Sequence, residues 1–332
     1  MKKIDVTANE IGALWTQYIQ NSMSVQILSY FLHIVEDEDI KLVVQYALDI
    51  AKKVMEDTSL LFKTEKLPHP NGFSEADVDL TAPRLYSDTF MLAFIENLGK
   101  AGIVAHGASL AVSTRKDLRE FFDESTKATM QLFNMAVDTA LSKGIYIRPP
   151  HIDVQDDVEY VESKKYLSAF QKRILNMIEV THLFENIKTN TIGEMVCKSF
   201  AQTTRSKDIQ NYMERGRQIS HKHIKIFAKT LEDSDIIPPM GSEYYVTNST
   251  IPVFSDRLIT FLMSVLSATG QGNYSTASTA SLRYDIALNY QRLSIEIALY
   301  AQDGAHIMIQ NGWLEEPPQA PNRKEILNKT NM

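Results

Sequence analysis

The sequence predicts an all-α fold made of two tandem four-helix bundles. Three features predict it: a long internal repeat, apolar residues at helical spacing within each repeat, and one longer loop in the middle of each repeat. The length of 332 residues also suits two domains of about 150 residues each.

The internal repeat is clearest in residues 84–150, which align without a gap with residues 252–318 at a shift of 168 positions. The upstream parts align at a shift of 169, with Glu10 opposite Glu179 and Asn21 opposite Asn190. A period this long indicates duplicated domains rather than a solenoid. The identical residues of the first repeat fall where helices are expected to start or stop: Ser87, Asp88, Leu98, Gly102, Ser113, Arg115, Asp117, Gly144, Pro149 and Pro150.

Each repeat is expected to form four helices, and those of the first lie near 6–34, 38–65, 85–112 and 114–143. The second shows the spacing well, because its apolar residues recur every three or four positions. In the fourth, Ser113 is expected to cap the free N–H groups, and Asp117 suits the positive end of the helix dipole. Gly144 is expected to close this helix in a left-handed conformation, and the diproline after it prevents resumption. The counterparts 168 positions later carry the same expectations: Ser281, Asp285 and Gly312.

A loop of about twenty residues, rich in Pro, Gly and Asp, separates the second and third helices of each repeat, whereas the other loops are short. One long connection in the middle is the pattern of ferritin-like bundles. An acidic and then amphipathic segment between the repeats reads as a linker with one short helix. The predicted organisation is therefore 1–150 first bundle, 151–173 linker, 174–320 second bundle and 321–332 C-terminal tail.

The composition excludes several classes of partner. A net charge of −7 provides no basic field for phosphates, so nucleic acid is not expected to bind. A single cysteine, Cys197, allows no internal disulfide and fits a reducing compartment. No apolar segment of a secretory signal follows the N-terminal lysines, and no long apolar run is free of strong polarity, so a membrane is not expected as a partner either. These features predict a cytoplasmic location.

A metal centre is the first chemistry to look for in such a bundle. A di-metal carboxylate site needs Glu on two helices and Glu-x-x-His on the other two, and the sequence lacks this set. The second repeat nevertheless offers His223 and Glu296, so the expectation is either no cofactor or a single transition-metal ion. The alternative is a buried, hydrogen-bonded His223 paired with Glu296. The remaining candidate ligands are Glu179, Glu185, Asp303 and His306.

The third helix of each repeat is crowded with Gly, Ala, Ser and Thr. Glycine costs about 1 kcal/mol in a helix interior, so something must offset it. One interpretation is close approach of a neighbouring helix. The other is space for a ligand or water beside His106 or Tyr274.

Catalytic motifs are missing from the sequence, so no catalytic residue is predicted and enzyme activity is not the favoured interpretation. Cys197 lies on an apolar helix, where a free cysteine usually behaves as a small hydrophobe. No G-x-S-x-G elbow occurs. The stretch "GQGN" at 270–273 lacks the following lysine–serine pair of a phosphate-binding loop.

Several motifs carry a resemblance to a known family. The stretches "APRLYSDTF", "GASLAVSTRKDLREFF" and "LSKGIYIRPP", with "FSDRLITF", "GNYSTASTASLRYDIALNYQRL" and "DGAHIMIQNGWLEEPPQAP" in the second repeat, closely resemble a domain-of-unknown-function family of endospore-forming bacteria. Members of this family often carry the domain twice, and the family is similar to coat-F spore coat proteins and to ferritin-like bundles. The resemblance covers nearly all of residues 5–320. It implies the fold and the tandem layout, and it implies no activity.

The chain departs from the resembled family on its second helices, which often read like "KHIE". The stretch "HKHIKIF" keeps the histidine as His223 and has Lys225 in place of the acid. The stretch "KKVMEDT" keeps the acid as Glu56 and has Val54 in place of the histidine. Each repeat has therefore lost a different member of the pair, which weakens any metal site.

Two functions follow as hypotheses. The first is a non-enzymatic structural or interaction protein, cytoplasmic or spore-associated, whose partners are proteins, spore coat proteins among them. The alternative is a ferritin-like protein that binds a metal or a small ligand in the second bundle. The oligomeric state is left open.

Overall fold

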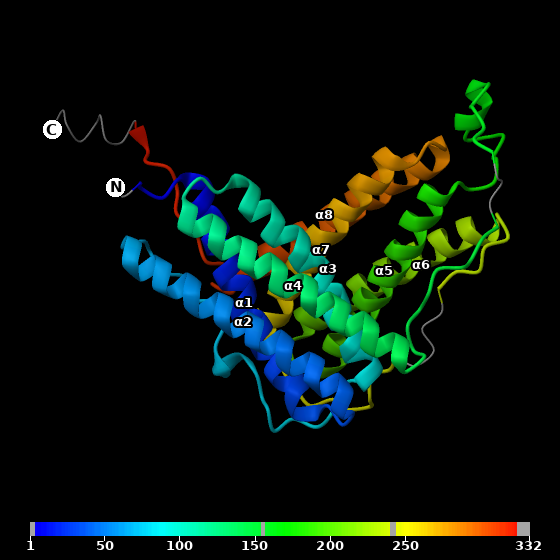
Figure 1. Cartoon of the computed structure of the whole chain (residues 1–332). Coiled ribbons are helices and arrows are strands. Elements are labelled where there is room, and N and C mark those ends of the chain that lie inside the picture. The colour runs from blue at the N-terminus through cyan, green and yellow to red at the C-terminus, as the bar shows by residue number, and fades with distance from the viewer. Residues whose placement is uncertain (1–3, 154–156, 240–243, 324–332) are drawn as a thin grey trace.

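The computed structural model describes residues 4–153, 157–239 and 244–323, and within these ranges the protein is all-α (Figure 1). Eight α-helices form two four-helix units there, which confirms the predicted fold class. The first unit contains α1 (Ala8–Ile34), α2 (Glu38–Glu65), α3 (Asp88–Val112) and α4 (Lys116–Ser142). The second contains α5 (Met177–Thr203), α6 (Lys207–Glu232), α7 (Asp256–Ala280) and α8 (Tyr284–Gln310).

The helix ends follow local chemistry at most positions. Ser87 and Ser255 cap α3 and α7, and each side chain accepts a hydrogen bond from the backbone N–H three residues on. Gly144 and Gly312, just past α4 and α8, both have φ +68°, so the predicted left-handed closing residues are confirmed. The linker contains the expected short helix, the 3₁₀ helix η2 (Lys164–Leu167).

The start of the fourth helix of each unit differs from the prediction. The hydroxyl of Ser113 donates to the backbone oxygen of Ser109 at the end of α3, and that of Ser281 donates to the oxygen of Ala277, so neither serine caps the next helix. The residue at the helix start is instead Arg115 or its counterpart, with no side-chain cap of its own. The prediction was wrong because each serine is the residue that directly follows the helix before, and its hydroxyl bonds back to that helix.

The backbone N–H groups at the starts of α4 and α8 donate hydrogen bonds to a glutamate on the first helix of the same unit. The Glu10 carboxylate on α1 accepts from the backbone N–H of Thr114 at 2.8 Å and of Arg115 at 2.9 Å. Glu179 on α5 does the same for Arg283, at 2.9 Å. Each buried carboxylate therefore ties the first helix of its unit to the fourth.

Within each unit the helices pack in a closed ring, in which the first contacts the second and third, and the fourth contacts the same two. The main hydrophobic core is continuous across both units, because Phe31 of the first and Phe200 and Phe254 of the second belong to one cluster. A smaller cluster around Phe227, Tyr274 and Tyr290 fills the far part of the second unit. Figure 1 shows the two units inclined to each other in a V.

The two crossover loops pair with each other, and the pairing is symmetric. Val78 forms an antiparallel bridge with Phe254, and Tyr86 forms one with Val246. Adding 168 to 78 gives 246, and adding 168 to 86 gives 254, so the second bridge is the first with the repeats exchanged. The four backbone hydrogen bonds obey the same rule: Asp79 to Val253, Thr247 to Leu85, Ser255 to Asp77 and Ser87 to Tyr245. The units are thus related by an internal two-fold axis.

The helices are 25 to 28 residues long, yet none of those described has the apolar composition that crossing a bilayer requires. Whether 1–150 and 174–320 fold as separate domains stays a prediction. Most of the expected tail, 324–332 of 321–332, lies outside the described residues.

Candidate functional site

A chain of polar side chains crosses the centre of the second unit and joins all four of its helices. Lys222 and His223 lie on α6, Glu296 on α8, Tyr274 on α7 and Asn190 on α5. His223 is fully buried and Tyr274 nearly so, whereas Glu296 and Lys222 reach the surface. Because side chains three or four positions apart share one face of a helix, each helix can point one of these side chains into the bundle at the same height.

The hydrogen bonds along this chain are short and mutually consistent. His223 Nε2 lies 2.9 Å from Glu296 Oε2, and His223 Nδ1 lies 2.9 Å from Tyr274 Oη. A carboxylate can only accept, so Nε2 carries the proton and Nδ1 accepts from the phenol hydroxyl. Tyr274 Oη in turn accepts from the Asn190 amide at 2.8 Å, and Lys222 Nζ holds both Glu296 oxygens at 2.9 Å. Both nitrogens of the buried imidazole are therefore satisfied.

Burial and charge set the protonation states in this chain. Burial lowers the pKa of His223, and this effect outweighs the hydrogen bond and charge of Glu296, which act in the opposite direction. Burial would raise the pKa of Glu296, but hydrogen bonds from His223 and Lys222 and the lysine charge lower it below its usual range. The stable state of the pair at neutral pH is thus a neutral imidazole beside a carboxylate.

The structure brings together two of the six predicted metal ligands, His223 and Glu296, and places the other four elsewhere. Glu185 pairs with Lys100 of the first unit at 2.6 Å. Asp303 pairs with Arg215, and His306 is exposed on α8. Glu179 is buried at the start of α5, where it closes the helix ends described above. Among the residues that the structure describes, no group of three or more His, Cys, Asp or Glu side chains could hold a metal ion, and the single-ion site stays a prediction.

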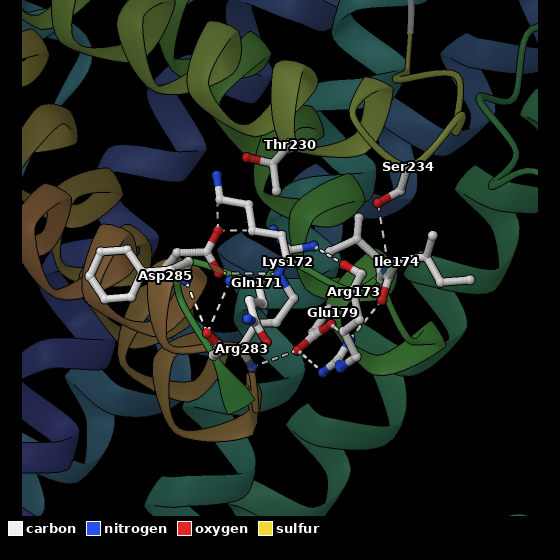
Figure 2. Close-up of polar contacts among 12 residues, drawn as sticks. Gln171, Lys172, Arg173, Ile174, Glu179, Thr230, Ser234, Arg283 and Asp285 are labelled. Carbon is white, nitrogen blue, oxygen red and sulfur yellow. Dashed lines mark hydrogen bonds and ion pairs between the residues drawn. The ribbon is translucent and has the colours of Figure 1, made fainter. Parts of the chain in front are cut away.

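The end of the linker is held against the second unit by a cluster around Arg173 (Figure 2). The Arg173 guanidinium forms a two-pronged ion pair with Glu179, at 2.8 and 2.9 Å, and lies 3.9 Å from the ring centre of Tyr166 in η2. The Arg173 carbonyl accepts from Arg283 at 2.7 Å, and Lys172 lies 3.4 Å from Asp285. Burial would raise the pKa of Glu179, but Arg173 and backbone N–H groups lower it.

The anchored linker, together with Ile174 directly after it, exposes large apolar side chains. Phe170 is 97% exposed, Tyr160 88%, Val158 86% and Ile174 77%. These four residues are named the linker patch. Acidic residues lie between and beside them in the sequence, including Asp157, Glu159 and Glu162. The sequence indicated an acidic, amphipathic segment here, but only the structure shows that its apolar side chains find no cover among the described residues.

Comparisons with known proteins add a family and a distant structural neighbour. A family profile described as "Protein of unknown function (DUF3231)" matches the chain twice, over residues 1–158 and 166–326. No functionally curated protein matches. The crystal structure of a candidate spore coat protein from Bacillus halodurans is similar at 20% sequence identity and a TM-score of 0.41, covering 45% of this chain and 98% of its own.

Proposed function

Because the chain belongs to the DUF3231 family of proteins of unknown function, we propose its role from its own geometry: a non-enzymatic interaction protein that binds a protein partner through the linker patch. The observation that carries this proposal is the exposure of Phe170, Tyr160, Val158 and Ile174 on a segment that Arg173 fastens to the second unit. Large apolar side chains that are exposed together on one segment, with polar residues beside them, indicate a protein interaction site.

The anchoring matters for affinity. A free linker loses much conformational entropy on binding, whereas a segment already held by Glu179, Tyr166 and Arg283 loses less. Aromatic side chains such as Phe170 and Tyr160 are also the residue types that dominate the energy of interfaces. The acidic residues nearby favour a partner with an apolar groove and basic residues at its rim. A spore coat protein is one such partner, because the resembled family is similar to coat-F spore coat proteins.

The centre of the second unit supports a non-catalytic role. Both nitrogens of His223 are occupied by Tyr274 and Glu296, and Glu296 is neutralised by Lys222. A general base or nucleophile needs a free position facing its substrate, and this chain of contacts leaves none on the imidazole.

Site-specific photocrosslinking tests the linker patch. A photoreactive phenylalanine analogue replaces Phe170 in one protein and Met130, which is 49% exposed on α4, in a matched control. After illumination in an extract of sporulating cells, we expect the Phe170 position to give one recurrent adduct that the Met130 position does not give. The adduct should weaken when Arg173→Ala releases the anchor. Equal adducts from both positions, or none from Phe170, would remove the proposal.

A second candidate function is binding of a single transition-metal ion by His223 and Glu296. The favouring observation is that an imidazole nitrogen and a carboxylate oxygen, both ligand types that such ions take, lie side by side at 2.9 Å. The pair is reached from the surface, because Glu296 is partly exposed. Such an ion would have to displace the Nε2 proton and compete with Lys222 for the carboxylate.

Elemental analysis separates the two candidates. The tag-free protein and a His223→Ala variant are measured as purified and after incubation with iron, zinc or manganese. About one equivalent of metal that the variant loses would support the ion site. Equal and negligible metal in both proteins would leave the interaction role alone.

A further inference from the structure

We propose that the first unit contains a binding site for a small uncharged ligand, a cavity beside His106 to whose wall the second unit contributes. This inference goes beyond the interaction role proposed above, since it concerns another part of the molecule. It starts from a cavity of about 180 Å³ at the centre of the first unit.

The cavity is built from both units. Side chains of α1 to α4 line most of it, and Val265, Ala268 and Thr269 of α7 complete the wall. An apolar cavity of about 150 Å³ in another protein accepts benzene, so this volume suits a molecule with one ring or a short branched chain. Helix α3 makes the space available with small residues, since Ala101, Gly102 and Ala105 all lie at the wall.

His106 is the unusual member of the lining. Its side chain is 95% buried (5% exposed), and its Nδ1 makes no hydrogen bond to any residue that the structure describes. Burial lowers the pKa of His106 to about 4, so the ring is neutral at physiological pH and offers one donor and one acceptor. Buried polar atoms normally have partners, and this unpaired nitrogen belongs to a side chain that lines the cavity.

The internal symmetry shows what is missing. Position 106 in the first unit corresponds to Tyr274 in the second, whose hydroxyl is satisfied by His223 and Asn190. The position corresponding to His223 is Val54, which cannot hydrogen-bond. The second unit therefore satisfies this position with its own polar side chains and leaves a smaller cavity of about 60 Å³ beside it, whereas the first leaves a histidine beside about 180 Å³.

The lining defines the chemistry of the ligand. None of its residues is charged, so a neutral molecule fits and an ion does not. Amide and hydroxyl groups of Gln17, Asn21 and Thr129 stand on the wall with His106, and the rest is mostly aliphatic. This combination suits an uncharged ring or branched chain that bears one hydroxyl or carbonyl group.

A route to the cavity lies between the units. A cleft of about 660 Å³, lined by α3, α5 and α7, adjoins the cavity, and the two share Ala101, Ala105, Ala268 and Thr269 as wall residues. Only small side chains stand between them. The ligand would thus enter where the units meet.

Ligand-observed NMR with phenol, benzoate and toluene tests the site at about pH 7. Phenol matches the volume and carries one hydroxyl, benzoate adds a charge, and toluene lacks the hydrogen bond. We expect phenol to bind the whole chain at least about tenfold more tightly than benzoate. His106→Phe should remove the preference for phenol over toluene, and Ala51→Leu, which fills the cavity, should abolish binding of both.

The matched control is Gly107→Ala, next to His106 on α3, where an added methyl group meets open space. It should bind phenol as the unchanged protein does. Ala51 is buried, so if Ala51→Leu does not fold, the comparison of His106→Phe with Gly107→Ala decides the matter. No binding of phenol, or equal binding to the His106→Phe and unchanged proteins, would overturn the proposal.

Discussion

Glu10 is a fully buried carboxylate, and both of its oxygens accept hydrogen bonds. It accepts from the N–H groups of Thr7, Thr114 and Arg115, and from the Thr7 hydroxyl. Burial would raise its pKa, but the backbone N–H groups of Arg115, Thr7 and Thr114 outweigh burial and lower the pKa to about 2. One side chain thereby completes the start of α1 and the start of α4.

Glu10→Gln is therefore expected to lower the free energy of unfolding by about 1–3 kcal/mol at neutral pH, because one oxygen becomes an NH₂ group that faces the N–H of Thr7. A carboxyl whose folded pKa is lowered contributes stability that is present above its unfolded pKa, near 4.5, and is lost as the pH falls towards about 2. Urea denaturation of both proteins from neutral to acidic pH checks this. The difference should shrink on acidification, whereas exposed Glu120→Gln should show almost no difference at any pH. A constant difference would contradict the charge-based explanation.

Tyr274 and Tyr290 test how much the polar chain of the second unit contributes. Both are buried in one cluster, but the Tyr274 hydroxyl contacts His223 at 2.9 Å and Asn190 at 2.8 Å, while the Tyr290 hydroxyl has only a contact of 3.5 Å with Asn186. Tyr274→Phe should cost about 1–3 kcal/mol, since it leaves buried polar atoms without partners. Tyr290→Phe should cost less than about 1 kcal/mol. Chemical denaturation measures both, and equal losses would mean that the chain contributes nothing specific.

At the scale of the helices, Gly216 on α6 and Gly304 on α8 allow these two helices to pack closely. A methyl group added at Gly216 would meet the Tyr300 hydroxyl and lie 2.7 Å from Cys197 Sγ, and one at Gly304 would meet the Tyr212 hydroxyl. The rings of Tyr212 and Tyr300 stack at 4.3 Å between the two helices. Each tyrosine therefore lies over a glycine of the opposite helix.

Gly216→Ala should destabilise the protein by about 1–3 kcal/mol through overpacking, although alanine is the better helix former. The control is Gly107→Ala on α3, where nothing lies within 4 Å of the added carbon. That change should stabilise the protein by about 0.5–1 kcal/mol. Thermal unfolding of the two variants should therefore shift in opposite directions, and a gain in both would show that α6 and α8 can separate at no cost.

The helices themselves were predictable from local signals, and their partners were not. Apolar spacing and Gly144 place the ends of α2 and α4 to within a residue or two, because these signals lie inside the helix concerned. The cap of α4 could not be found in this way, since its donor groups and Glu10 are about a hundred residues apart in the chain. The small residues of α3 fit both interpretations, close helix packing and space for a ligand. Gly99 and Gly102 lie against Phe133 and Thr129 of α4, and the same helix borders the cavity.

The candidate site was predictable only in part. His223 and Glu296 share a level of the bundle, which helical spacing can indicate. Glu185 pairs with Lys100 of the first unit, so its orientation depends on where that unit lies. Asp303 pairs with Arg215 on α6, and His306 is exposed, so their positions depend on how α6 and α8 pack. The linker patch and the orphaned His106 likewise depend on what covers a side chain in three dimensions, for which the sequence carries no local signal.

At the scale of the whole molecule, the two units share one core and a symmetric pairing of loops. Arg257 adds to this pairing, since its guanidinium lies 2.9 Å from the Asp77 carboxylate and donates to the Gly72 carbonyl at 2.6 Å. On another side, buried Glu96 of the first unit pairs with Lys188 of the second at 2.9 Å. The linker is largely exposed, and none of these contacts between the units involves it.

We therefore expect the units to stay together after the linker is cut. A specific protease site inserted at residues 157–159, where the chain is exposed, allows the cut to be made in the folded protein. Size-exclusion chromatography should then show one species of unchanged size, because an interface with a continuous hydrophobic core resembles a domain interior rather than a transient contact. Arg257→Glu, which places two carboxylates face to face across the loops, should make the cut protein separate at lower dilution, while exposed Lys127→Glu on α4 should not. Separation of the unchanged protein into two species after the cut would mean that the linker, and not the paired loops, holds the units together.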